Sequence, residues 1–217
     1  MSPTGTVNPS APSRTGVFGG TFDPIHLGHL IAAEDVRSQL GLERMLFVPN
    51  SYPPHKQDRE VTPVDDRVAM VRLGIASNPS FRLDLTEVDR PGPSFAVETM
   101  RALRSGGADA DEPVFVLGGD ALFGLSEWHE PDRFIAENVI VVMDRPIGDA
   151  SPGRDAASWD ALRARFPSIS ERLMPVHVAR IGISAHDIRN RVAEGRSIRY
   201  LVPDAVADYI AERGLYR

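Results

Sequence analysis

The sequence predicts an α/β protein built around a doubly wound parallel sheet. Six short runs rich in apolar and β-branched residues recur along the chain, at 15–19, 45–50, 81–88, 113–119, 139–143 and 175–181. The segments between them are long enough for crossover helices, and this alternation is typical of parallel sheets with helices on both faces. The 217 residues suffice for one domain with a sizeable core.

Capping signals place the helices. Apolar residues at helical spacing predict a helix from Gly28 to about Leu40. A second helix should begin with Thr62 as N-cap and Pro63 at its first position, and run to about Ser77. Further helices are expected from an N-cap at Ser94 to about Ser105, over 185–194 with Gly195 at its end, and over 203–213 with Gly214 at its end.

The domain organisation is simple. Residues 1–15 are rich in Ser, Thr and Pro and lack the apolar segment of a signal peptide, so they are expected to form a flexible tail. Residues 16–217 should form a single domain, with 183–217 as a small helical subdomain at its C-terminal end. Turn formers and charges over 145–155 predict a mobile surface loop.

Composition excludes several classes of function. The net charge of −6 disfavours non-specific binding to nucleic acid, which requires a broad basic surface. No apolar run approaches the roughly 18 residues of a membrane span. The chain has no cysteine, so neither disulfides nor thiolate metal sites are possible. We therefore expect a cytoplasmic protein without nucleic-acid or membrane partners.

The stretch from Gly16 to Val36, GVFGGTFDPIHLGHLIAAEDV, predicts a phosphate site. It places glycines between a strand and a helix start, where the backbone can approach an anion and the helix dipole favours negative charge. The stretch lacks the patterns of a P-loop and of a dinucleotide-binding turn. His26 and His29, three residues apart, should lie on one face of the first helical turn, where both rings can donate to phosphoryl oxygens. A helical zinc pair would need a third ligand, and none is apparent.

The string GGTFDPIHLGHL resembles the signature of the HxGH nucleotidylyltransferase superfamily, and its Phe-Asp-Pro-Ile-His wording is most similar to the bacterial nicotinate-nucleotide adenylyltransferases. The resemblance implies a Rossmann-like nucleotidylyltransferase fold. It also implies transfer of AMP from ATP to nicotinate mononucleotide, giving nicotinate adenine dinucleotide and pyrophosphate in NAD biosynthesis. Mg²⁺ would be bound through the ATP phosphates, without a metal site on the protein. A homo-oligomer is compatible with the resemblance.

The resemblance assigns residues to the ATP site. Catalysis would fall to His26, His29 and Arg189, which stabilise the phosphates as pyrophosphate leaves. Ile183 to Arg189 stand in the place of the family's I-S-x-T-x-x-R, with His186 where threonine is usual. Ser184 can cap that helix, and Asp187 can complete a capping box. The expected ATP-binding residues are Gly19, Gly20, Thr21, Phe22, His26, Gly28, His29, Gly118, Asp120, Ile183, Ser184, His186 and Arg189.

A second group of residues matches the family's mononucleotide site. Trp128 would stack on the nicotinate ring, and the backbone N–H of His129 would bind its carboxylate. Lys56, in a Pro-Pro-His-Lys loop, would reach the phosphates, and Thr86 and Arg90 belong to a segment that lines this site. In that segment Phe95 and Ala96 replace the usual tyrosine and threonine, so any hydroxyl contact from these two positions is lost.

Alternatives remain open from the residues alone. Adenylyltransferases of the same superfamily that act on nicotinamide mononucleotide or on phosphopantetheine share parts of the opening motif. Trp128 and the loop that ends at Lys56 favour a pyridine nucleotide. A module that binds nucleotides without catalysis is the other alternative, and only His186 favours it.

Overall fold

The computed structural model describes residues 15–51, 61–106, 112–144, 156–179 and 181–217. The predicted tail, apart from Thr15, and the predicted loop 145–155 lie outside these residues. Among the helices that are described, none combines the length and the apolar character that a membrane span requires.

The core of the protein is a parallel sheet, as the sequence predicted. Its strands are β1 (Thr15–Gly20), β2 (Arg44–Pro49), β3 (Phe81–Leu83), β4 (Val114–Gly118), β5 (Ile140–Asp144) and β6 (Leu173–His177), in the order β3-β2-β1-β4-β5-β6. All neighbouring strands pair in parallel. The order reverses between β1 and β4. In open sheets of this kind, ligands bind at that point, outside the carboxyl ends of the strands.

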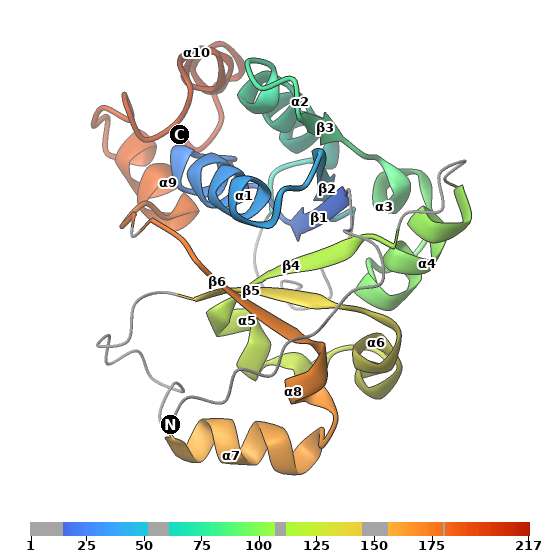
Figure 1. Cartoon of the computed structure of the whole chain (residues 1–217). Helices are drawn as coiled ribbons and strands as arrows, with labels where there is room; N and C mark the ends of the chain where they lie inside the picture. The colour runs from blue at the N-terminus through green and yellow to red at the C-terminus, as the bar shows by residue number, and fades with distance from the viewer. Residues whose placement is uncertain (1–14, 52–60, 107–111, 145–155, 180) are drawn as a thin grey trace.

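Helices connect the strands and cover both faces of the sheet. They are α1 (Leu27–Leu40), α2 (Val64–Ile75), α3 (Thr86–Asp89), α4 (Ala96–Gly106), α5 (Gly119–Phe123), α6 (Pro131–Glu137), α7 (Ala156–Arg165), α8 (Ile169–Arg172), α9 (Ala185–Ala193) and α10 (Asp204–Arg213). In Figure 1, α1, α2, α9 and α10 gather in the upper part of the view, and α5, α6, α7 and α8 in the lower part.

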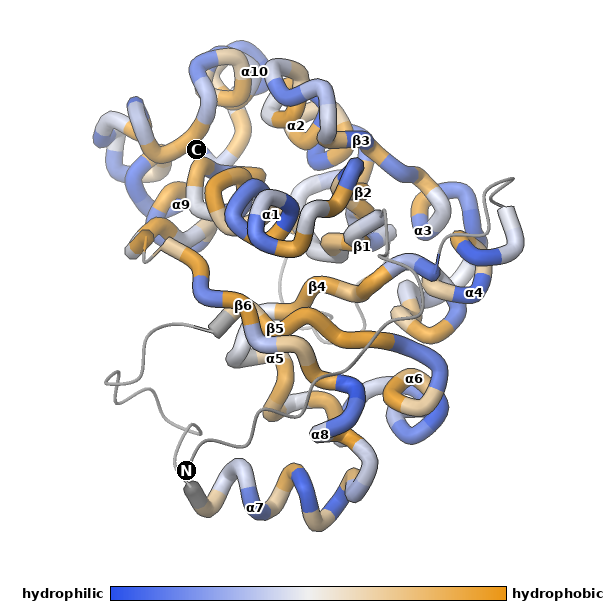
Figure 2. The backbone as a smooth tube through the Cα atoms, in the orientation of Figure 1, coloured by the Kyte–Doolittle hydropathy of each residue, from blue (hydrophilic) through white to orange (hydrophobic). Residues whose placement is uncertain are grey.

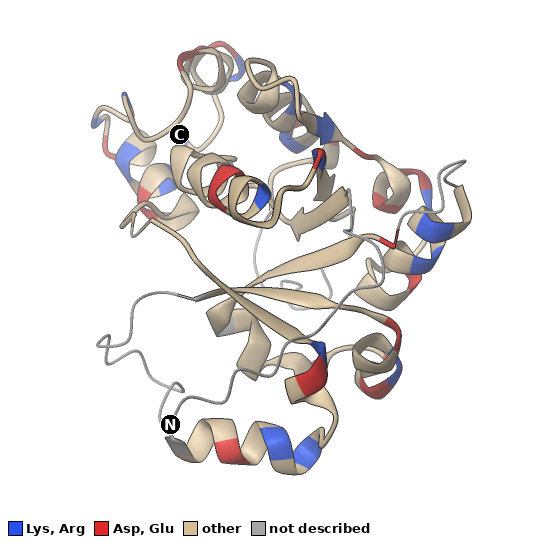
Figure 3. Ribbon diagram, viewed as in Figure 1, with Lys and Arg blue, Asp and Glu red and all other residues tan. Residues whose placement is uncertain are grey.

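Alternation along the strands divides the core into two clusters. Phe18 of β1 and Phe47 of β2 pack with α1, α2, α9 and α10, whereas their neighbours Val17 and Val48 pack with the helices from α4 to α8. This alternation follows from the two-residue repeat of a strand buried on both faces. Figure 2 shows the central strands β4 and β5 as an apolar band, and Figure 3 shows charged residues mainly on the surrounding helices and connections.

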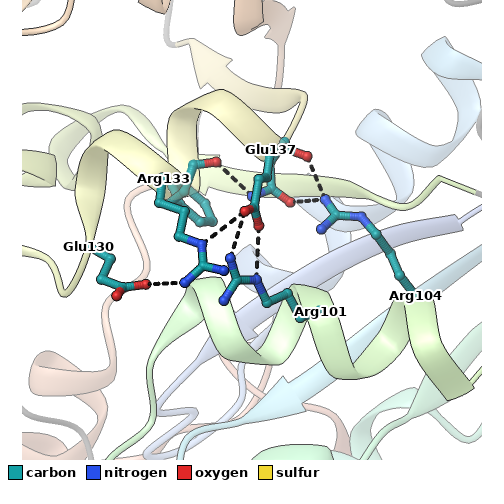
Figure 4. Close-up of polar contacts among 7 residues, drawn as sticks. Arg101, Arg104, Glu130, Arg133 and Glu137 are labelled. Carbon is teal, nitrogen blue, oxygen red and sulfur yellow. Dashed lines mark hydrogen bonds and ion pairs between the residues drawn. The ribbon is translucent and has the colours of Figure 1, made fainter.

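A surface network joins α4 to α6 (Figure 4). Glu137 accepts two hydrogen bonds from Arg101, of 2.6 and 3.0 Å, and one from Arg133 at 3.0 Å. Arg104 donates to the carbonyl oxygen of Glu137 at 2.7 Å, and Glu130 pairs with Arg133. The hydrogen bonds from Arg101 lower the pKa of Glu137. The network ties α4 to α6, and none of its five labelled residues is among those that line the cavity described below.

Two predicted boundaries near the site were wrong. The strand expected over 81–88 ends at Leu83, because the side chain of Asp84 accepts a hydrogen bond from the backbone N–H of Thr86 at 2.9 Å and turns the chain into α3. Ser94 does not cap α4. Its hydroxyl accepts a hydrogen bond from the N–H of Ser51 at 3.0 Å, and the first turn of α4 closes on the carbonyl of Phe95.

Two further boundaries differ from the prediction. Pro63, and not Thr62, is the N-cap of α2, and it makes no side-chain capping bond. The last strand begins at Leu173 and ends at His177, not over 175–181, because its partner β5 ends at Asp144 opposite His177. The predicted helical ends at Gly195 and Gly214 are confirmed, and both glycines adopt the left-handed conformation, with φ of 68° and 63°.

Candidate active site

A cavity of about 540 Å³ opens at the carboxyl ends of β1 and β4, where the strand order reverses. Its volume falls in the range typical of pockets for small molecules. Five of the residues assigned from the sequence contribute to its wall: Gly19, Thr21, Gly118, Trp128 and His129. The cavity therefore joins the glycine turn after β1 to the aromatic segment after α5.

Aromatic rings form one wall of the cavity. The ring of Trp128 packs edge-on against Phe115, with centroids 6.0 Å apart, which holds the indole beside the cavity. The ring of His129 stacks on Phe95 at 4.0 Å with an interplanar angle of 21°. Phe95, which stands where the family usually has tyrosine, is thus a cavity residue that supports His129.

His26 and His29 form a reciprocal capping box at the start of α1. The N–H of His29 donates to Nδ1 of His26, and the N–H of His26 donates to Nδ1 of His29, each over 3.3 Å. The two rings stack with centroids 3.6 Å apart and an interplanar angle of 20°. The histidine pair thus occupies the positions that serine and glutamate take in a common capping box. It also explains why α1 begins one residue before the predicted start.

This arrangement fixes the tautomers of both rings. Because each Nδ1 accepts a hydrogen bond, a neutral ring must carry its proton on Nε2. Burial lowers the pKa of His26 to about 4, so this ring is neutral at physiological pH. At the same helix end, the N–H of Leu27 donates to the carbonyl of Leu201 at 2.9 Å. The backbone N–H groups of Leu27 and His29 are therefore engaged within the protein, and the two imidazoles can present Nε2–H donors instead.

The residues before the histidine pair support the rings. Phe22 is buried and packs edge-on against His29, with centroids 5.2 Å apart. Its φ of 49° lies in the left-handed region, which a bulky residue adopts only where its surroundings hold it. A Cβ atom at Gly20 would lie 3.0 Å from the Phe22 ring, so a side chain there would have to displace this ring by a few tenths of an ångström. The side chain of Phe22, assigned to ATP binding from the sequence, serves as packing behind His29.

The start of α9 lies beside the start of α1. Ser184 caps α9 as predicted, accepting a hydrogen bond from the N–H of Asp187 at 3.1 Å. Ile183 lies near Gly28, where an added Cβ would be 3.7 Å from the Cβ of Ile183. Arg189 donates to the carbonyl oxygen of Asp23 at 2.7 Å. The second predicted phosphate segment is therefore anchored to the loop that carries the histidines.

The capping box predicted for α9 is only half present. The Asp187 carboxylate accepts from Arg191 at 2.8 Å and so faces along its own helix. His186 is exposed, and its Nε2 lies 3.1 Å from the side-chain nitrogen of Asn190. In this structure His186 contacts its own helix.

Other predicted residues lie away from the cavity wall or outside the described part. Thr86 and Arg90 are not among the residues that line the cavity, and Arg90 pairs with Glu98 at 3.6 Å. Asp120 lies in the first turn of α5, directly after β4. Lys56 is not among the described residues.

A buried polar network that was not predicted from the sequence adjoins the cavity, whose lining includes Thr21, Asn50 and Glu87. Arg67 of α2 is 1% exposed and donates 2.8 Å hydrogen bonds to the carbonyl oxygens of Thr21 and Asn50. The side chain of Asn50 donates to Glu87 at 2.7 Å, and the hydroxyl of Thr99 donates to the same carboxylate at 2.8 Å. A signal for Arg67 was present, because it lies three residues before Met70 and four before Val71 on the apolar stripe of α2.

The fold and this site together define a protein that binds nucleotides at the switch point of a parallel sheet. The cytidylyltransferase-like family model matches residues 17–191. A probable nicotinate-nucleotide adenylyltransferase of Thermomicrobium roseum is 46% identical over 94% of this chain and 92% of its own length. Its counterpart in Symbiobacterium thermophilum is 44% identical over 94% and 95%. The chain belongs to the cytidylyltransferase-like family and, within it, to the group of the probable nicotinate-nucleotide adenylyltransferases.

Solved structures agree with the fold. The nicotinic acid mononucleotide adenylyltransferase of Plasmodium falciparum, complexed with NaAD, superposes with a TM-score of 0.69 at 16% identity, covering 93% of this chain and 96% of that one. The same enzyme complexed with APC gives a TM-score of 0.68 at 16% identity, covering 94% and 97%. At this identity the likeness establishes the architecture.

Proposed function

We propose that this protein transfers the adenylyl group of ATP to nicotinate mononucleotide and releases pyrophosphate. The observation that carries the proposal is the reciprocal capping box of His26 and His29, which can present two Nε2–H donors. Arg189 and the capped start of α9 lie beside this pair. The family and the names of its members support the choice of substrates.

The chemistry requires positioning and charge stabilisation. A phosphate oxygen of the mononucleotide attacks the α-phosphorus of ATP, and the bond from that phosphorus to the bridging oxygen of pyrophosphate breaks. The second pKa of a phosphate monoester is near 6, so the nucleophile is largely a dianion at pH 7 and needs no general base. His26 and His29 would donate to the oxygens of the α-phosphate, where charge shifts during transfer. Arg189 and Lys56 would bind the departing pyrophosphate.

ATP would enter as its Mg²⁺ complex, and the ion, held through the ATP phosphates, would offset part of their negative charge. In the described part of the chain, no group of three or more His, Cys, Asp or Glu side chains is arranged to hold a metal ion. The donors around the phosphates are imidazole and guanidinium groups, which suit the anionic complex.

Selectivity for the mononucleotide would arise in the cavity. Trp128 offers an aromatic face for the pyridine ring, and the backbone N–H of His129 would bind the nicotinate carboxylate. Thr86 and Arg90, which do not line the cavity, would complete this subsite from the start of α3 and from the residue after its end. We further propose that the enzyme acts in the cytoplasm, where ATP is available, and that 183–217 forms a helical subdomain whose α9 supplies Arg189 to the ATP site.

The test is pyrophosphate release by the purified protein with ATP and Mg²⁺. Nicotinate mononucleotide, nicotinamide mononucleotide and phosphopantetheine are compared as acceptors at equal concentrations. A clear preference for the nicotinate nucleotide is expected. Preference for either of the other two acceptors would replace the substrate assignment, and ATP binding without turnover on any acceptor would favour a nucleotide-binding module.

A further inference from the structure

The C-terminal segment reaches the loop that carries the histidine pair. Asp23 lies in that loop, three residues before His26, and is only 4% exposed. The hydroxyl of Tyr216, the second-last residue, donates to Oδ1 of Asp23 at 2.7 Å. The carbonyl oxygen of Asp23 accepts from Arg189 at 2.7 Å, and the N–H of Thr62 approaches Oδ2 at 3.5 Å. Asp23 thus joins the loop between β1 and α1 to three segments distant in sequence.

We propose that Tyr216 is a positioning residue for adenylyl transfer, acting through Asp23 on the loop that holds His26 and His29. The inference rests on the proposed function and assigns to the C-terminal segment a role beyond packing. Tyr216 would touch neither substrate.

The backbone on both sides of the contact between Tyr216 and Asp23 depends on neighbouring contacts for its conformation. Phe22, the residue before Asp23, and Tyr216 itself both have positive φ, 49° and 64°. Non-glycine residues remain in this conformation only where neighbouring contacts hold them, and a hydrogen bond to a carboxylate is stronger than one between neutral groups. Burial, and then the nearby Asp23 carboxylate, raise the pKa of Tyr216, so its hydroxyl keeps its proton and remains a donor.

The rest of the loop transmits the position of Asp23 to His26. Ile25 is fully buried and lies against Gly74 of α2, where an added Cβ would be 3.0 Å from Ile25 and 3.6 Å from Val206 of α10. Between Asp23 and His26 the chain therefore has little room to adjust. A shift of Asp23 toward solvent would move the histidine rings, whose capping bonds are already long at 3.3 Å.

The chain offers a matched control. Tyr209 of α10 donates to Oδ1 of Asp66 on α2 at 2.7 Å, and Asp66 is 5% exposed. Both contacts join a half-buried tyrosine of the C-terminal segment to a buried aspartate. Asp66, however, lies on α2 and accepts from Arg213, not from any residue of the histidine loop. Loss of either hydroxyl should lower stability, and only loss of the Tyr216 hydroxyl should affect the reaction.

The experiment compares Tyr216→Phe with Tyr209→Phe in the full-length protein. We expect a decrease in Tm for both variants. The kcat of Tyr216→Phe should fall about tenfold with the KM for ATP within about twofold, because small displacements of catalytic groups slow the reaction more than they weaken binding. Tyr209→Phe should keep its kcat. An unchanged kcat in Tyr216→Phe, or equal losses in both variants, would overturn the inference.

Two further measurements separate this inference from the proposed function. If Tyr216 acts through Asp23, the double variant Asp23→Asn/Tyr216→Phe should have the kcat of Asp23→Asn alone, since the two residues form one unit. The ¹⁵N NMR signals of the His26 and His29 imidazoles require no turnover. They should shift in Tyr216→Phe and not in Tyr209→Phe, and identical spectra for the two variants would reject the positioning role even if the substrate assignment failed.

Discussion

Replacing Gly28 by alanine tests whether the stacked histidines must keep their present positions. A Cβ atom at Gly28 would lie 3.0 Å from Nδ1 of His26 and 3.2 Å from its Cε1. The His26 ring cannot move away freely, because it is 6% exposed and is stacked on His29 at 3.6 Å. A displacement of a few tenths of an ångström would stretch the capping bond of 3.3 Å beyond hydrogen-bonding distance.

The expected effects on stability and on activity are very different. Alanine favours a helix by about 1 kcal/mol over glycine, and loss of the N-cap bond costs about the same, so the free energy of unfolding should change by less than about 1 kcal/mol. Misplacing one preorganised donor costs about 3 kcal/mol in the transition state, which is about a hundredfold in kcat. Gly28→Ala should therefore be nearly as stable as wild type and about a hundredfold slower.

Gly106 provides the control for this prediction. It ends α4, and an added Cβ would meet no atom of the described residues within 4 Å, so Gly106→Ala should be at least as stable as wild type and should keep its kcat. Turnover is followed by pyrophosphate release and stability by urea unfolding. A kcat for Gly28→Ala within about threefold of wild type would refute this role of the histidine positions. It would mean that the rings can be displaced without losing their stabilisation of the transition state.

Three other substitutions address the same site. His29→Ala should lower kcat by at least about a hundredfold with a modest change in KM, measured by steady-state kinetics; a large KM effect with kcat intact would exclude its transition-state role. The pKa of the His26 side chain is about 4 in the folded protein and 6.5 in the unfolded chain. Between pH 6.5 and pH 4 the unfolded chain therefore binds a proton that the folded protein does not, and the free energy of unfolding decreases as the pH falls. Between pH 7 and pH 4 the free energy of unfolding of wild type should fall by about 3 kcal/mol more than that of His26→Asn. Asparagine can still cap the helix but does not titrate in this range. Equal losses in the two proteins, measured by urea unfolding at both pH values, would contradict the effect of burial on His26. Arg67→Met should destabilise the protein by about 3 kcal/mol or more, because the buried carbonyls of Thr21 and Asn50 lose their donor; a loss below about 1 kcal/mol in urea unfolding would mean that water replaces it.

The fold was predictable because its signals are local. Apolar runs and capping residues placed the six strands and the helices α1, α9 and α10 within a few residues. The error at Ser94 arose from a contact distant in sequence, whereas the early end of β3 arose from a local hydrogen bond between Asp84 and Thr86. Ser94 has the local pattern of an N-cap, yet its hydroxyl accepts from Ser51, which is distant in sequence and adjacent only after the sheet has formed. A capping preference gives no information about such a competing donor.

The candidate site was predictable only in part, for a related reason. The motif indicated that His26 and His29 share a face, and the structure places them so, but no helix-capping preference includes a histidine pair. Arg67 and Tyr216 were missed because their partners are backbone carbonyls and a carboxylate in other segments. Charge and spacing in the sequence can identify residues that would contact a ligand. They do not identify the residues that hold such ligand-binding side chains in position.

The capping bonds of the histidine pair give a physical reason why the proposed phosphate site would use imidazole donors where many phosphate sites use backbone amides. The N–H groups of Leu27 and His29 are engaged by Leu201 and by His26, so the start of α1 is tied to the C-terminal segment and to itself. Backbone amides at this helix end already have acceptors, whereas the Nε2 atoms of the two rings are not used by the capping bonds. Nδ1 of each ring accepts a capping hydrogen bond, so the proton of a neutral ring lies on Nε2. The contact that caps the helix therefore also fixes the orientation of the Nε2–H group that would bind phosphate. Burial keeps His26 neutral, so this ring would donate a hydrogen bond without carrying a positive charge. A positive charge would bind ATP strongly and would stabilise the ground state as much as the transition state, which gives no gain in kcat.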